Sequence, residues 1–237
     1  MKSKICKMFF YISTFALLSF SNCNHDNQDE PDNPTEDKDY VVSGSLEGHD
    51  YVDLGLSVKW ATCNISAINN NPANVGQYYS WGVTTHQTYF EWADYSYWTD
   101  LNGDGYFSDE ELTDIGKEIS GTKYDVATKR WGGGWRMPTK DEMEELLTKC
   151  KISVTTRDDT FGFKLQGPNG NCLFLPASGY WDRHESHSLT SGHYWTSTRC
   201  PSPDYNRAWY GSIGKNGYGR IYWSIKRSGL PVRAVCD

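Results

Sequence analysis

Several common signatures are missing from this sequence, and each absence removes a class of protein. The 237 residues contain no P-loop, no dinucleotide-binding fingerprint, no nucleophile elbow and no Ser-His-Asp order, so none of these familiar enzyme patterns applies. No two cysteines have the spacing of a zinc-binding CxxC pair. Positive charge is also scarce. The 23 Lys and Arg face 30 Asp and Glu, and the resulting net charge of −7 argues against nucleic acid as a partner.

Residues 1–22 have the pattern of a lipoprotein signal peptide. A basic start leads into an apolar stretch, residues 8–20, which is too short to span a bilayer as a mature helix. Residues 17–23 resemble a lipobox, in which Cys23 is acylated and becomes the new N-terminus. Asn22 departs from the small residue usual before that cysteine, so cleavage to a soluble secreted or periplasmic form stays open.

Residues 23–39 form an acidic segment that predicts a disordered tether. Residues 24–39 carry seven acids against one lysine and almost nothing apolar, so this stretch cannot bury enough surface to fold. An acidic patch after the acylated cysteine resembles the surface-export signal of Bacteroides-type lipoproteins. We therefore expect a lipid anchor in the outer membrane with the domain at the cell surface. A plain solvated linker is the alternative.

The strongest chemical signal is a calcium-loop pattern in residues 100–111. The segment matches D-x-[DN]-x-[DN]-G-x5-E at every required position, and Gly105 permits the sharp turn. Ca²⁺ prefers six to eight oxygen ligands, which this spacing wraps around one point. The expected ligands are side chains, one backbone carbonyl and one water-mediated contact, from Asp100, Asn102, Asp104, Tyr106, Ser108 and Glu111.

The surroundings of this loop favour a structural calcium site over a paired EF-hand sensor. Residues 94–99, before the loop, do not have a helical pattern, whereas residues 110–119 could form an exiting helix. In an exported protein a weak site, with a Kd of about 10⁻⁴–10⁻³ M, would suffice to fix a surface loop. An acidic turn that binds nothing is the alternative.

Residues 40–237 predict an α+β domain of short antiparallel strands, two short helices and long loops. The clearer helix begins at Thr139, which forms a Thr-x-x-Glu capping box with Glu142 and follows Pro138, and it should end near Cys150. A shorter helix is expected within residues 124–131.

Most of the remaining domain has strand patterns. The turn at residues 167–170 separates two apolar runs and predicts a β-hairpin. The expected strands lie within residues 51–61, 77–81, 161–165, 172–175, 192–197, 207–213, 219–225 and 230–235.

The cysteines allow at most two disulfides in the mature chain. Of seven, Cys6 leaves with the signal peptide and Cys23 is the lipidation site, so five remain in a compartment that permits oxidation. Cys172 lies in an apolar run and is expected to be a buried thiol. We expect disulfides between Cys63 and Cys150, and between Cys200 and Cys236.

Several motifs together resemble a known family. These are Tyr-Val-Asp-Leu-Gly-Leu-Ser-Val-Lys-Trp-Ala-Thr-Cys-Asn at 51–64, Trp-Gly-Gly-Gly-Trp-Arg-Met-Pro-Thr at 131–139, Phe-Leu-Pro-Ala-Ser-Gly-Tyr at 174–180, Tyr-Trp-Thr-Ser-Thr at 194–198 and Gly-Leu-Pro-Val-Arg-Ala-Val at 229–235. Residues 48–236 resemble the Fibrobacter major paralogous domain (FISUMP) family. That resemblance implies an exported cell-surface protein with a C-type-lectin-like fold, similar to the formylglycine-generating enzyme group.

Two departures from these relatives argue against a transferred activity. The catalytic cysteine arrangement of the formylglycine-generating enzymes is not recognisable around Cys200 or Cys236. The Glu-Pro-Asn or Gln-Pro-Asp triplet of sugar-binding C-type lectins is absent, and Pro203-Asp204 is a poor substitute. Because one fold serves many functions, the fold alone assigns none.

We therefore expect a non-catalytic surface module that binds a glycan or a protein. Tyr180, Trp181 and His184 lie in an expected loop and are the proposed ligand contacts. The alternatives are a structural component of a surface or fimbria-like assembly and, with no support from the sequence, an enzyme of the formylglycine-generating type.

Overall fold

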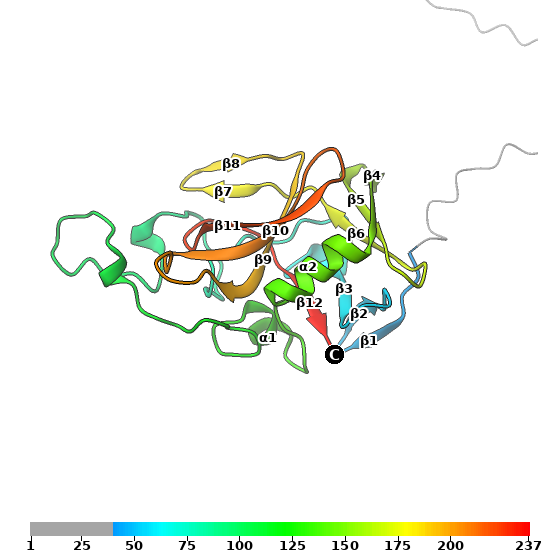
Figure 1. The fold of residues 1–237 in the computed structure, drawn as a ribbon, viewed down its shortest axis with the longest axis horizontal. Coiled ribbons are helices and arrows are strands. Elements are labelled where there is room, and N and C mark those ends of the chain that lie inside the picture. Colours follow the sequence, from blue (N-terminus) through cyan, green and yellow to red (C-terminus); the bar gives the residue numbers. More distant parts are fainter. Residues whose placement is uncertain (1–39) are drawn as a thin grey trace, which may run out of the picture. The chain divides into compact units, whose positions relative to one another are not determined.

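The computed structural model describes residues 40–237, which form small antiparallel sheets with few helices (Figure 1). A four-stranded sheet has the order β1 (Gly44–Leu46), β2 (His49–Val52), β3 (Lys59–Asn64), β12 (Arg233–Cys236). A second sheet has the order β4 (Lys151–Arg157), β5 (Thr160–Gln166), β6 (Cys172–Pro176). A third has the order β11 (Gly219–Ile225), β10 (Arg207–Ile213), β9 (Gly192–Arg199), and a hairpin joins β7 (Tyr180–Asp182) to β8 (Glu185–His187). The predicted α+β class, with strands predominating, is confirmed at this level.

Both predicted helices are present. α1 (Val126–Trp131) is capped by Asp125, and α2 (Lys140–Lys149) has the reciprocal capping box of Thr139 and Glu142. Three short 3-10 helices complete the described helical segments: η1 (Ile68–Asn70), η2 (Trp92–Asp94) and η3 (Asp109–Glu111).

The predicted hairpin is also present, with Gln166 opposite Cys172 across the turn. Residues 77–81 were expected to form a strand, but they make only an isolated bridge between Tyr79 and Leu230. The backbone N–H of Trp81 donates a hydrogen bond to the Lys226 carbonyl. This segment therefore pairs with a turn and not with a continuous strand.

The buried side chains form two hydrophobic clusters that share the β3–β12 pair. Trp60 and Val235, which lie opposite each other, belong to the cluster under α2. Their neighbours Ala61 and Ala234 belong to the other cluster, with Trp81, Trp135 and Trp195. Successive strand residues point to opposite faces, so one strand pair supplies both cores.

Helix α2 packs closely against the sheet of β9, β10 and β11 (Figure 1). A Cβ atom on Gly211 of β10 would come within 2.5 Å of the Met143 sulfur, so only glycine fits beneath the helix there. Met143, Leu146 and Leu147 form the buried face of the helix, as the sequence pattern predicts.

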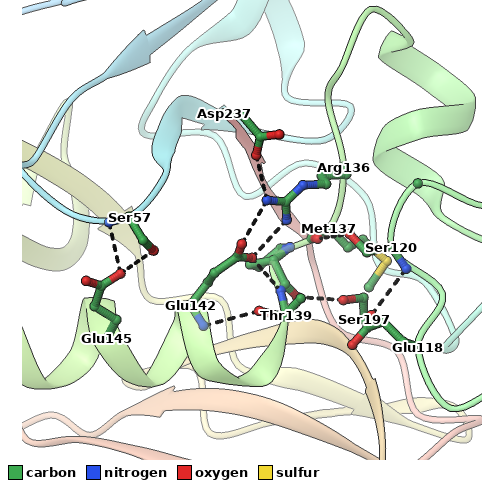
Figure 2. Close-up of polar contacts among 12 residues, drawn as sticks. Ser57, Glu118, Ser120, Arg136, Met137, Thr139, Glu142, Glu145, Ser197 and Asp237 are labelled. Carbon is green, nitrogen blue, oxygen red and sulfur yellow. Dashed lines mark hydrogen bonds and ion pairs between the residues drawn. The ribbon is translucent and has the colours of Figure 1, made fainter.

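Polar contacts fix the ends of α2 to the rest of the domain (Figure 2). Arg136 donates two hydrogen bonds to the Glu142 carboxylate, at 2.9 and 2.8 Å, and a third to Asp237 at 2.8 Å. Glu145 accepts hydrogen bonds from both the backbone N–H and the hydroxyl of Ser57. The helix thereby joins the chain terminus and the loop between β2 and β3.

The two predicted disulfides are not formed. Cys63, Cys150, Cys200 and Cys236 are buried free thiols. Cys150 ends α2 in one core, whereas Cys236 lies on β12 in the other. Burial raises the pKa of the Cys150 thiol to about 12 and that of Cys200 to about 11, which disfavours the reactive thiolate. Cys172 is buried in β6, as predicted.

The predicted signal peptide, the acidic tether and the lipidation site at Cys23 lie outside the described residues. Among residues 40–237, no helix combines the length and the apolar character that crossing a membrane requires.

Asp125 is the buried polar group on which the loop before α2 depends. Its carboxylate accepts hydrogen bonds from the backbone N–H groups of Gly121, Ala127, Thr128 and Met137, and the side chain is fully buried. Asp125→Ala leaves these donors unsatisfied and should lower the free energy of unfolding by about 2–4 kcal/mol in urea titrations. The exposed control Asp141→Ala should change it by less than about 0.5 kcal/mol. Equal stability of the two variants would contradict this role.

Candidate functional site

The 100–111 loop projects from the domain between two paired chain segments (Figure 1). Thr99 donates through its N–H to the Glu111 carbonyl at 3.2 Å, and Thr113 donates to the Tyr97 carbonyl at 2.8 Å. Trp98 and Leu112 form a β-bridge between these segments. The prediction of a helix within residues 110–119 is wrong. The pairing with the preceding segment keeps the chain extended after the short η3 helix.

Carboxylate and amide oxygens organise the backbone inside the loop. Asp100 accepts from the N–H groups of Gly103 and Gly105, at 2.7 and 2.9 Å. Asn102 accepts from Asp104, and Asp104 in turn accepts from Tyr106. Gly105 has a φ of +75°, the left-handed conformation that the calcium-loop pattern requires at this position.

Glu111 closes the loop from its far end. One carboxylate oxygen accepts from the Leu101 N–H at 3.0 Å, and the other accepts from the Ser108 N–H and the Trp98 indole, each at 3.1 Å. Glu111 is buried, whereas most of the loop is exposed. Its carboxylate therefore contacts both ends of the loop at once.

The donor set has the chemistry that calcium prefers. Asp100, Asn102, Asp104, Ser108 and Glu111 supply hard side-chain oxygens, and Tyr106 supplies its backbone carbonyl oxygen. Within residues 40–237, no three His, Cys, Asp or Glu side chains already converge as a metal cage, since the acids here accept backbone N–H groups.

A cavity of about 610 Å³ lies against this loop. Four aromatic side chains line it: Trp92, Trp98, Tyr106 and Phe107. The Trp92 ring stacks on Phe107 at 3.7 Å between centroids, with the planes 13° apart. The loop and η2 therefore meet at this ring stack and both contribute to the lining, so the position of the loop affects the shape of this loop cavity.

Charged groups complete the lining of the loop cavity. Glu91, Asp100, Arg183 and Arg227 reach it from four different parts of the chain. Arg227 is buried and is fixed by an ion pair with Asp182 at 2.5 Å and a hydrogen bond to the Phe90 carbonyl at 2.6 Å. Aromatic rings beside a small number of fixed polar groups are a feature of small-ligand sites.

The three predicted ligand contacts do not come together. Tyr180 stacks between His187 and His193, at 5.2 Å from each ring. Trp181 packs edge-on against Tyr78 and lines a separate cavity of about 320 Å³. His184 is exposed and pairs with Glu91 at 2.8 Å. The segment forms the β7–β8 hairpin and not the expected loop, so adjacent side chains point to opposite faces.

Sequence reasoning missed the residues that make the loop cavity. Trp92 and Phe107 lie 15 positions apart, and nothing local in the sequence indicates that they stack on each other. Arg183 and Arg227 are 44 positions apart, and only the β7 pairing with Gly229 brings their segments side by side.

Comparison of the chain with protein-family models, with curated proteins and with solved structures found no match.

The stacked histidine beside Tyr180 makes stability depend on pH. Burial lowers the pKa of His193 from 6.5 to about 4. The unfolded chain therefore takes up a proton before the folded one does, and stability falls as pH drops from about 6.5 to about 4, by up to about 3 kcal/mol. His193→Phe keeps a flat ring and should remove this part of the acid dependence in urea titrations.

The exposed His86→Phe serves as the control and should retain the wild-type acid dependence. The assignment to His193 fails if both variants lose stability with falling pH as the wild type does.

Proposed function

We propose that this chain is a non-catalytic, cell-surface binding module that takes a glycan in the loop cavity and uses calcium to hold the 100–111 loop. The single observation that supports it most is the loop cavity itself. Its aromatic side chains offer flat apolar surfaces, and its carboxylate and guanidinium groups offer the hydrogen bonds that sugar hydroxyls need.

Calcium acts in this proposal as a structural ion. The loop carries Asp100, Asp104 and Glu111 and the additional acids Asp109 and Glu110, which repel one another without a cation. A bound Ca²⁺ offsets that repulsion and favours one loop conformation. Phe107 then stays stacked on Trp92, which keeps the lining of the loop cavity in one arrangement.

Display at the surface follows from the N-terminal sequence. Acylation of Cys23 would give a lipid anchor, and the acidic residues of 24–39 would separate the domain from the membrane. The motifs shared with the FISUMP family and its C-type-lectin-like fold are compatible with small antiparallel sheets, few helices and long loops.

A protein ligand is the second form of this proposal. The exposed side chains of Tyr106 and Leu101 in the loop are the observation in its favour, since aromatic residues such as tyrosine are enriched at protein interfaces. The polar, charged lining of the loop cavity favours a glycan, and a screen against both ligand classes separates them.

The calcium assignment predicts a metal-dependent gain in stability. With a Kd of about 10⁻⁴–10⁻³ M, 10 mM Ca²⁺ should stabilise the wild type by about 1–3 kcal/mol. Asp100→Asn combined with Glu111→Gln removes two ligand charges at constant size and should abolish the gain. Thermal unfolding with CaCl₂ or with EGTA measures it.

A matched control tests whether the removal of any two acidic residues from the loop abolishes the stabilisation by calcium. Asp109→Asn with Glu110→Gln removes two charges from the same loop outside the ligand set, and it should retain the calcium response. If the wild type gains no stability in CaCl₂, the calcium assignment is wrong.

The loop cavity predicts which side chains a ligand needs. Trp92→Ala removes the ring that faces Phe107 and should weaken binding at least about tenfold for any glycan found on an array. Tyr218→Ala, an exposed aromatic outside the cavity, should leave that affinity unchanged. Equal binding by Trp92→Ala and the wild type would place the ligand elsewhere.

A further inference from the structure

A second cavity, of about 360 Å³, lies on another side of the 100–111 loop. Asp109 from the end of the loop, Asp114, Lys117, Arg199, Tyr205 and Lys226 line it. None of these residues lines the loop cavity, so the two spaces are separate. This cationic cavity contains the two buried basic side chains described next, in a protein whose net charge is −7.

Lys226 is buried and, among the described residues, makes no ion pair at contact distance, although Asp114 and Asp109 are close enough to act on its charge. It is 2% exposed, and among the described residues its ammonium has one recorded contact, with the Trp81 ring at 4.9 Å. Buried ammonium groups are normally paired or hydrogen-bonded, because removing an unpaired charge from water is costly. Because Lys226 lines a cavity, its ammonium is placed to receive an external anion.

Within residues 40–237, the Arg199 side chain also lacks a hydrogen-bond partner for one of its buried N–H groups. Its side chain is 5% exposed, and its Nε–H is buried with no hydrogen-bond partner among the described residues. One terminal nitrogen pairs with Asp114 at 3.2 Å, and the guanidinium lies over the Tyr205 ring at 4.6 Å. The Asp114 side chain is 68% exposed, so the carboxylate that pairs with Arg199 lies mostly in solvent.

The lining carries more positive than negative charge. Three basic residues, Lys117, Arg199 and Lys226, face two acids, Asp109 and Asp114, which leaves one positive charge unbalanced. One monovalent oxyanion would neutralise the cationic cavity. A divalent phosphate would leave it negative, so a carboxylate or a sulfate ester fits the charge better.

We propose that the cationic cavity is a binding site for the monovalent oxyanion of an acidic sugar, with Lys226 and Arg199 as its ligands. The cavity volume of about 360 Å³ exceeds what the anionic group alone needs, which leaves room for a sugar ring beside it. The proposed ligands Lys226 and Arg199 lie outside the 100–111 loop, so this site stands if the calcium assignment or the glycan in the loop cavity fails.

Titration calorimetry of the intact chain tests the site with three probes: glucuronate, galactose 6-sulfate and neutral galactose. At least one acidic probe should bind, which identifies the anionic group, and galactose should not. Lys226→Met should weaken that binding at least tenfold, while the exposed control Lys215→Met leaves it unchanged. Asp114→Asn removes the competing charge and keeps an oxygen acceptor for Gly116 and Arg199, so it should tighten binding severalfold.

The wild type alone gives a second test in case Lys226→Met does not fold. Burial, and next the neighbouring Arg199, lower the pKa of Lys226 to about 8, while Asp114, Cys200 and Asp109 oppose this shift. Only the protonated amine attracts an anion, so affinity should fall as pH rises through about 8. The proposal is overturned if neither acidic probe binds, if galactose binds equally well, or if affinity is constant from pH 7 to pH 9.

Discussion

The pairing of β3 with β12 is the contact on which the rest of the domain depends. It joins an early strand to the last one, and its alternate residues enter two different cores through Trp60 and Val235 on one side and Ala61 and Ala234 on the other. Arg233 is fully buried there and bonds to Asn64 and to the Ala61 carbonyl. The approach to β12 then places residues 226–230 against Tyr79, Trp81 and β7.

The course of residues 226–230 explains why the two cavities lie near each other. Lys226 and Arg227 are neighbours in the chain, yet one lines the cationic cavity and the other the loop cavity. Arg227 has Asp182 and the Phe90 carbonyl as partners, whereas Lys226 has an aromatic ring. The difference in partners marks one side chain as part of the scaffold and the other as available to a ligand.

Local signals in the sequence predicted local structure well. The capping box of α2 and the turn between β5 and β6 are complete within a few residues, so the sequence alone could predict them. The sequence did not predict three other features: the extended segment after residue 111, the free state of the four cysteines expected to form disulfides, and the burial of Lys226. Each of these depends on contacts between distant segments. For example, the bridge from Trp98 to Leu112 overrides the helical preference of the acidic exit, and no pattern within residues 110–119 encodes it.

The 100–111 loop contributes to both cavities, and this gives the two proposed sites a physical connection. Phe107 and Tyr106 line the loop cavity, and Asp109, two positions further on, lines the cationic cavity. Glu111 holds both stretches through Leu101, Ser108 and Trp98. A cation that fixes the loop therefore fixes one wall of each cavity, and ligands in the two cavities would favour the same loop conformation. Coupling of this kind is reciprocal, so each ligand would strengthen calcium binding by the factor by which calcium strengthens its own.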